Sequence, residues 1–166
     1  GTWTELTGFQ SATTVDTIRS MATTRGAYKT TNNLFIGTNK GKIWRLKDPV
    51  NAAASTQPTQ VFSLGSNATV IDIAVNPRND DTVLAVLSNY NTQSIWISNN
   101  ANSAVPTWTS VEGNIAEPSV RSCEIIVKST GVEYYVGTSV GLYSTVTLSG
   151  GATAWVKEGA GTALEY

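Results

Sequence analysis

Three acidic residues, Asp16, Asp72 and Glu124, stand out because each lies within or next to a short run of β-branched residues. Two carboxyl groups at a fixed separation can cleave a glycosidic bond as acid and base. Carboxylates arranged around a channel can instead bind a cation. The structural alternative is that each carboxylate accepts hydrogen bonds from neighbouring strands or faces water.

The composition excludes several other kinds of chemistry. The chain has no histidine, which removes the commonest general base and metal ligand. Its single cysteine, Cys123, cannot form an internal disulfide, and its apolar neighbours indicate a buried thiol rather than a nucleophile. We therefore predict no catalytic residue outside the carboxylates, no metal site and no cofactor.

The charge pattern also limits the partners. Eleven basic and twelve acidic residues nearly cancel, and only 14% of the 166 residues are charged. Nucleic-acid binding and polybasic membrane binding both need a concentrated positive field, so neither is expected. No apolar run is long enough to span a bilayer, so we expect no membrane insertion.

The elements that must position these residues repeat along the chain. LFIGTNKGKIWRL (residues 34–46) returns one hundred residues later as YYVGTSVGLYSTV (134–146), with Gly37 matching Gly137. A middle copy, VLAVLSNYNTQSIWIS (83–98), has a longer turn. Each copy is typical of two strands joined by a polar turn.

Further strands complete each copy. A β-branched run precedes each hairpin, at residues 14–21, 70–75 and 122–127, and a short strand follows each, at 60–64, 107–111 and 154–158. Four short strands repeated about every 50 residues are typical of β-propeller blades. The predicted fold is therefore all-β, with four-stranded antiparallel blades at residues 11–66, 67–114 and 115–166. Residues 1–10 would supply the fourth strand of a preceding blade.

Three blades cannot close the usual ring of four to eight. We therefore expect part of a larger propeller, whose remaining blades come from the same parent protein or from other chains. The first strand of each blade lines the channel of a propeller. Asp16, Asp72 and Glu124 are predicted to occupy equivalent places in those strands and to line the channel.

A second candidate site is the rim formed by the turns between second and third strands and by the links between blades. Loops on a rigid scaffold commonly carry recognition, so this rim is predicted to bind a glycan or a protein surface. The alternative is ordinary solvated turn chemistry, because turns favour Asn and Gly in any case. The rim residues are Asn39, Lys40, Asn89, Tyr90, Asn91, Arg121 and Ser139.

The sequence resembles secreted β-propellers of the sortilin/BNR (Asp-box) class, closest to extracellular proteins that carry a type IX (Por) secretion sorting domain. The likeness rests on GTNKGKIWRL, VIDIAVNPRNDDTVLAVLSNYNTQSIWIS and YVGTSVGLYSTVTL, and it covers essentially the whole chain. It implies a secreted or cell-surface bacterial protein exported as type IX cargo. The implied function is a non-catalytic binding or scaffold module for carbohydrate or protein. The alternative is an Asp-box glycoside hydrolase that uses the channel carboxylates.

The Asp-box of that class reads roughly Ser-x-Asp-x-Gly-x-x-Trp between the third and fourth strands. Here SNNANSAVPTW, residues 98–108, has Asn100 in place of the Asp and a stretched spacing. The third copy, STVTLSGGATAW at residues 144–155, keeps only the Gly and Trp. In this class the box stabilises a turn, so we expect a structural role for both segments.

Overall fold

A computed structural model describes residues 5–12, 16–65, 68–88, 92–115 and 118–159. Nearly all of the regular structure in these residues is β-strand, arranged in three sheets of four strands. Every ladder is antiparallel, and within each sheet the strand order follows the chain. The prediction of an all-β fold with three four-stranded blades is therefore confirmed.

We call the three sheets blade 1, blade 2 and blade 3. Blade 1 comprises β1 (Ile18–Thr23), β2 (Asn33–Thr38), β3 (Lys42–Lys47) and β4 (Thr59–Ser63). Blade 2 comprises β5 (Thr69–Val75), β6 (Val83–Ser88), β7 (Ile95–Ser98) and β8 (Thr109–Ser110). Blade 3 comprises β9 (Val120–Lys128), β10 (Gly131–Thr138), β11 (Gly141–Thr145) and β12 (Val156–Lys157).

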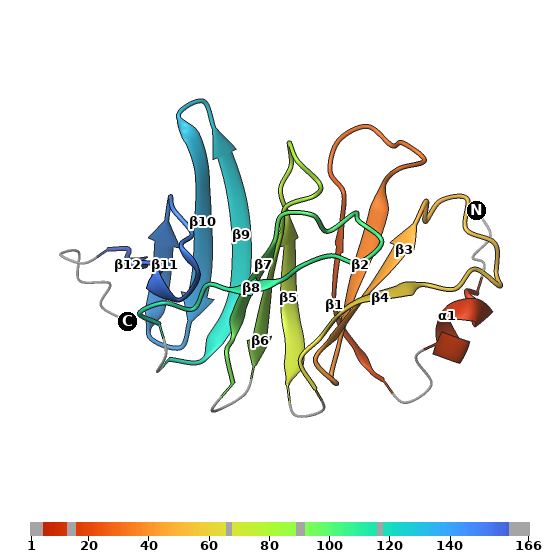
Figure 1. Ribbon diagram of the computed structural model, residues 1–166, viewed down its shortest axis with the longest axis horizontal. Coiled ribbons are helices and arrows are strands. Elements are labelled where there is room, and N and C mark those ends of the chain that lie inside the picture. The colour runs from red at the N-terminus through yellow and green to blue at the C-terminus, as the bar shows by residue number, and fades with distance from the viewer. Residues whose placement is uncertain (1–4, 13–15, 66–67, 89–91, 116–117, 160–166) are drawn as a thin grey trace.

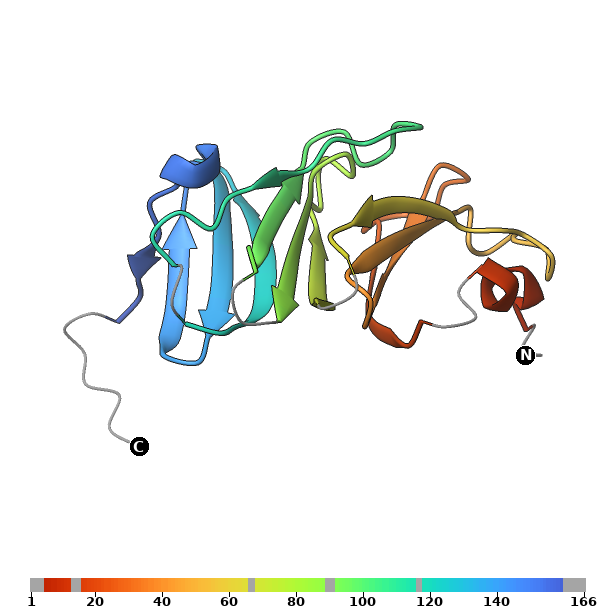
Figure 2. The ribbon, with the colours of Figure 1, turned by 60° about the horizontal axis from the view of Figure 1, so that its bottom comes forward.

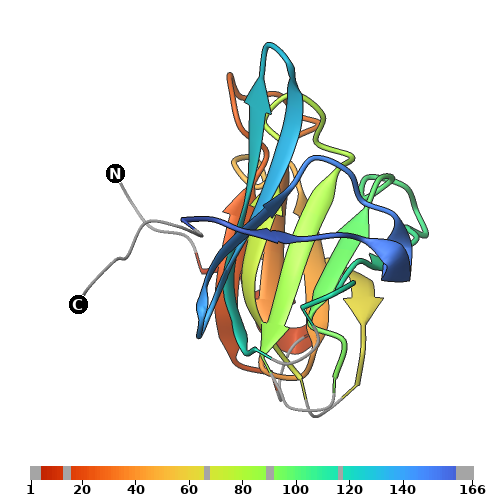
Figure 3. The same ribbon diagram turned by 90° about the vertical axis from the view of Figure 1, so that its left-hand side faces the viewer.

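The blades follow one another along the long axis of the molecule and pack face to face (Figures 1 and 2). Their first strands β1, β5 and β9 are neighbours, whereas the fourth strands lie on the opposite side of the stack (Figure 3). No ladder joins strands of different blades among the described residues. Each repeat of the sequence therefore folds as its own sheet, and side chains hold the sheets together.

Two hydrophobic cores lie between the blades. Between blades 1 and 2, Phe35 and Ile43 pack with Val70 and Val83, all fully buried or nearly so. Between blades 2 and 3, a second core is built in the same way; its fully or almost fully buried members include Leu84, Val86, Ile95, Val120 and Val136. A single blade cannot bury both faces, so this stacking supplies most of the hydrophobic stabilisation.

Two tryptophans form hydrogen bonds between neighbouring blades at the outer edge of the stack. The indole Nε1 of Trp108 donates to the carbonyl oxygen of Val61 in blade 1 over 2.9 Å. The indole Nε1 of Trp155 donates in the same way to Val111, beside β8 of blade 2, over 2.8 Å. Each ring therefore fills space between two blades and also satisfies its polar atom, as buried indoles generally do.

The N-terminal segment differs from the expected strand. Residues 1–4 lie outside the described residues, and Glu5 and Leu6 belong to no strand. A short helix, α1 (Thr7–Ala12), follows and lies at the end of the molecule beyond blade 1 (Figure 1). The backbone N–H of Gly8 donates to the carbonyl oxygen of Ala54 over 2.8 Å, which ties the helix to the β3–β4 loop.

Candidate functional site

The three candidate carboxylates do not occupy equivalent positions. Asp16 precedes β1 by two residues, whereas Asp72 lies inside β5 and Glu124 inside β9. The prediction of one shared register position is therefore wrong. The ladders show the offset: Ser20 pairs with Gly37 as Ser122 pairs with Gly137, so Glu124 corresponds to Ala22, and Asp16 lies six residues before that position.

Asp16 has a structural role at the lower end of blade 1. Its carboxylate lies 3.2 Å from the Lys42 ammonium, and its side chain is only 1% exposed. The hydroxyl of Thr38 lies 3.4 Å from the same carboxylate. A buried carboxylate paired with a lysine stabilises the fold but is shielded from any substrate.

Asp72 links two blades. One oxygen accepts the backbone N–H of its neighbour Ile73 over 2.9 Å, and the other accepts the backbone N–H of Cys123 in blade 3, also over 2.9 Å. An analogous link joins blades 1 and 2, where the Ser20 hydroxyl donates to the carbonyl oxygen of Val70 over 2.9 Å. The Asp72 carboxylate therefore fastens adjacent first strands together.

Glu124 forms an ion pair that spans the middle blade. Its carboxylate lies 3.1 Å from the guanidinium of Arg25, which belongs to the β1–β2 loop of blade 1. The two side chains are 43% and 55% exposed, and the carboxylate also accepts the backbone N–H of Ile125. Both residues line a groove of about 360 Å³ along the first strands, which also includes Met21 and Asp72. The Glu124 carboxylate is therefore partly open to solvent, unlike the buried carboxylate of Asp16.

The rim predicted from the sequence lies at the lower ends of the blades in Figure 1. There the Asn39 amide oxygen accepts the backbone N–H of Thr17, so Asn39 ties the β2–β3 turn to the segment that precedes β1. Ser139 donates its backbone N–H to Ser119 in the link to blade 3, and Arg121 is an exposed residue of β9. Lys40 is part of the β2–β3 turn. Residues 89–91, which include the predicted Asn89, Tyr90 and Asn91, lie outside the described residues.

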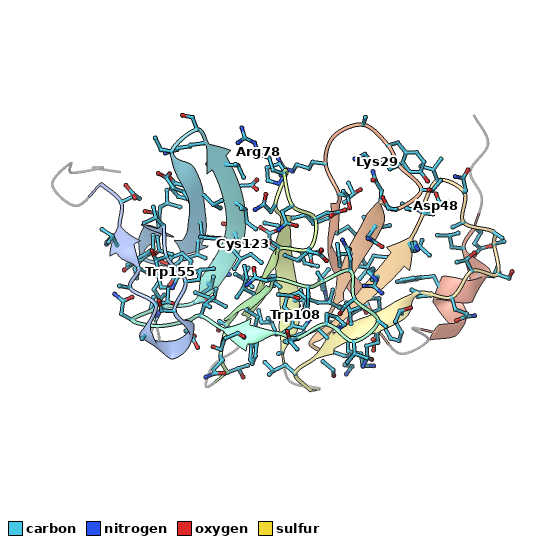
Figure 4. All side chains as sticks on the ribbon, turned by 45° about the horizontal axis from the view of Figure 1, so that its top comes forward. Lys29, Asp48, Arg78, Trp108, Cys123 and Trp155 are labelled. Carbon is cyan, nitrogen blue, oxygen red and sulfur yellow. The ribbon has the colours of Figure 1, made fainter. Side chains whose placement is uncertain are left out.

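The opposite ends of the blades carry a basic groove that sequence reasoning missed. The β1–β2 loop and the β5–β6 loop border a cavity of about 430 Å³, whose charged lining residues are Arg25, Lys29, Arg78 and Asp80. Figure 4 shows Lys29 and Arg78 on these two neighbouring loops. Both residues are exposed, and neither side chain has a hydrogen-bonding or ionic partner in the described part of the chain. We call this cavity the loop groove.

A second cavity, of about 510 Å³, adjoins the loop groove and shares Thr31 and Asp80 with it. It contains Arg45, whose guanidinium donates to the carbonyl oxygens of Ala101 and Ser103 over 2.5 and 2.8 Å. Burial lowers the pKa of Arg45, and the charge of the nearby Asp81 partly opposes that shift. Arg45 is therefore a structural residue of this surface, whereas Lys29 and Arg78 remain available to a ligand.

The segment that resembles an Asp-box has the hydrogen bonds of a turn-stabilising device. The Asn100 amide oxygen accepts the backbone N–H of Thr107 over 2.8 Å and its hydroxyl over 3.1 Å, and it also accepts the hydroxyl of Ser98 over 3.2 Å. In the third blade, the Thr153 hydroxyl bonds both Ser149 and Gly150. The expected structural role of both segments agrees with these bonds.

Cys123 is buried between blades 2 and 3, and burial raises the pKa of its thiol well above the ordinary value.

The residues that the structure describes contain no group of three or more metal-ligating side chains. Within the same residues, no helix has the length and hydrophobicity needed to cross a bilayer.

No model of a known protein family matches the sequence, and a search of curated proteins also gives no match. The fold therefore characterises the chain: it is an all-β protein of antiparallel four-stranded blades, compatible with a β-propeller-like architecture. A fold of this kind does not define a function, so the evidence for function lies in the grooves and the residues that line them.

Proposed function

We propose that the chain is a non-catalytic binding and scaffold module that takes an acidic ligand, an anionic carbohydrate or an acidic protein segment, in the loop groove. The observation that carries the proposal is a pair of cations, Lys29 and Arg78, that have no partner among the described residues and lie on two loops that border one cavity. Loops fixed by a rigid β-scaffold are common recognition surfaces. A guanidinium and an ammonium in a shared concavity favour carboxylate, sulfate or phosphate groups.

The bonds of the candidate carboxylates support binding over catalysis. A glycosidase needs two carboxyl groups that face one substrate at a set separation. Asp16 is buried against Lys42, and both oxygens of Asp72 hold backbone N–H groups. Among the described residues of its groove, Glu124 has no second free carboxylate, so the hydrolase alternative has less support.

The wider context remains as the sequence resemblance proposes it: a secreted or cell-surface bacterial propeller of the sortilin/Asp-box class, exported by type IX secretion. The hydrogen bonds of Asn100 support the comparison with an Asp-box. The remaining blades of the ring are proposed to come from the same parent protein or from other chains.

The direct test is a binding titration with a defined acidic probe. The purified chain is titrated with a heparin-derived sulfated oligosaccharide and, in parallel, with a neutral oligosaccharide of similar length. We expect binding of the sulfated probe only, with an affinity that falls as salt is raised, because exposed charges are screened. Arg78→Ala should weaken binding about tenfold or more, which corresponds to the loss of about 1.4 kcal/mol.

Lys40→Ala is the matched control, since it also removes one cation but lies at the opposite end of the blades. Loss of binding in Lys40→Ala with retention in Arg78→Ala would move the site to the rim predicted from the sequence. Failure of both probes to bind the parent chain would contradict an acidic-carbohydrate site. An acidic peptide in the same titration tests the protein alternative.

A further inference from the structure

Blade 3 has one face against which no other described blade packs, although Arg25 of the β1–β2 loop reaches Glu124 on its first strand. Cys123, Ile125 and Val136 point toward blade 2 and are buried. On the other face Ile126 is 41% exposed, Leu142 45% and Val156 65%. An isolated exposed apolar residue is ordinary, but this face carries one on three of its four strands, and such a patch marks an interaction surface.

One row of this face repeats a row of the blade 1 face that packs against blade 2. In blade 1 the ladders place Ser20 opposite Gly37 and Gly37 opposite Ile43. In blade 3 they place Ser122 opposite Gly137 and Gly137 opposite Leu142. The same serine, glycine and aliphatic residue therefore form a row on both blades. In blade 1 the aliphatic residue is fully buried, whereas in blade 3 it is exposed.

In blade 1, the glycine of this row leaves space that a side chain of the neighbouring blade occupies. A Cβ atom at Gly37 would lie 2.5 Å from Val70 Cγ1 and 2.8 Å from Val70 Cβ, so the valine of β5 occupies the space that a side chain would fill. The Ser20 hydroxyl donates to the carbonyl oxygen of the same valine. At Gly137 the corresponding position is approached within 4 Å only by the side chain of Ser122.

The two ends of the stack are not alike. Ile36 and Leu46 of blade 1 are 3% and 1% exposed although they belong to neither core between the blades. Helix α1 lies at that end, and its Phe9 is 8% exposed (Figure 2). Ile36 and Leu46 of blade 1 are therefore covered within the chain itself, although Met21, which pairs with Ile36, is 63% exposed. Among the described residues, the outer face with exposed apolar side chains on three strands is that of blade 3.

We propose that the free face of blade 3 docks a further four-stranded blade of the same repeat type. Its first strand presents a β-branched side chain to Gly137 and a backbone carbonyl oxygen to the Ser122 hydroxyl. The carboxylates on the same face already have partners. Glu133 pairs with Lys128 at 2.5 Å and accepts the Tyr135 hydroxyl at 2.6 Å, Glu124 pairs with Arg25, and Glu158 accepts the Ser144 hydroxyl. Burying a charged group costs less free energy when the group is already paired and hydrogen-bonded than when it is isolated.

The test adds such a blade to the full chain. We choose a copy of blade 2 as the added blade, because its Val70 already occupies the space beside Gly37. An extended protein carries residues 67–114 a second time after residue 159. We expect one cooperative unfolding transition with a higher urea midpoint and a larger m-value, because more surface becomes buried. We also expect weaker binding of an exposed-hydrophobic dye than for the parent chain.

Gly137→Val supplies the matched variant. In the parent chain the new side chain meets only the Ser122 side chain, which can rotate away, so the urea midpoint should change little. In the extended protein the same valine should remove the gain in midpoint. The opposite results would overturn the proposal: a separate transition for the added blade, or equal gains with and without Gly137→Val.

The parent chain tests the other occupants of this face. Sedimentation should show a monomer that Leu142→Glu does not alter. A dimer that dissociates in Leu142→Glu would assign the face to a second copy and would also overturn the proposal. The inference rests on the stacking of the blades and not on the loop groove, so failure of either proposal leaves the other in place.

Discussion

Replacing Trp155 by Phe tests whether the indole bonds between blades stabilise the stack. Trp155 is 3% exposed, and its Nε1 donates to the carbonyl oxygen of Val111 over 2.8 Å. Phe keeps most of the ring but cannot donate, so the Val111 oxygen loses its partner. A buried acceptor left without a partner costs about 1–3 kcal/mol. The free energy of unfolding should therefore fall by about this amount, and Trp155→Ala should lower it by about 3–5 kcal/mol.

Trp44→Phe is the matched control. The Trp44 Nε1 is buried and has no hydrogen-bond partner in the described part of the chain. The same substitution at that residue removes no such hydrogen bond, so the loss in Trp155→Phe should exceed the loss in Trp44→Phe by about 1–3 kcal/mol. Urea unfolding followed by far-ultraviolet circular dichroism measures both variants. Equal losses at the two residues would refute the reasoning, because ring size alone would then explain the effect.

Two further experiments probe the contact between blades 2 and 3: a substitution of Asp72, and the labelling and pH dependence of the Cys123 thiol. Asp72→Asn replaces one carboxylate oxygen by a donor, so one of its two backbone N–H partners loses its acceptor. We expect a loss of about 1–3 kcal/mol in urea unfolding, while the control Asp48→Asn, at a carboxylate that accepts the Asn51 amide of its own turn, changes stability by less than about 0.5 kcal/mol. Because burial raises the pKa of Cys123, its thiol should stay protonated in the folded chain and react with a disulfide reagent at pH 8 only after unfolding. As pH rises above the ordinary thiol pKa, the unfolded state loses this proton first, so stability should fall. Rapid labelling of the folded chain, or stability that rises with pH there, would contradict the assigned burial.

The blades could be predicted from the sequence because their signals are local. β-Branched runs and turn glycines mark each strand and each hairpin, and the fifty-residue period groups them by four. The exact register of each hairpin is less visible. The hairpins of blades 1 and 3 share their Gly-Thr pair and their turn glycine at the same spacing, yet Gly37 pairs with Ile43 whereas Gly137 pairs with Leu142. Gly41 adopts a positive φ of 64° in its turn, which lengthens that turn by one residue.

The candidate sites were harder to predict because they depend on how the blades meet. Asp72 looks like a channel carboxylate until its bond to Cys123 of the next blade is known. Lys29 and Arg78 belong to different repeats, and nothing in either loop indicates that the two loops border one cavity. Sequence periodicity defines each sheet, but the surface between two sheets follows from the three-dimensional stacking.

The most direct test of the stacked blades is the set of cross-strand nuclear Overhauser contacts of the backbone in solution. The account predicts contacts between strands of the same repeat, such as Cys123 with Val136 and Asp72 with Val86, as adjacent pairs in antiparallel ladders. It predicts no ladder between the described strands of different repeats, although β1, β5 and β9 lie side by side. A continuous ladder between any two of these first strands would contradict it, because the repeats would then share a sheet.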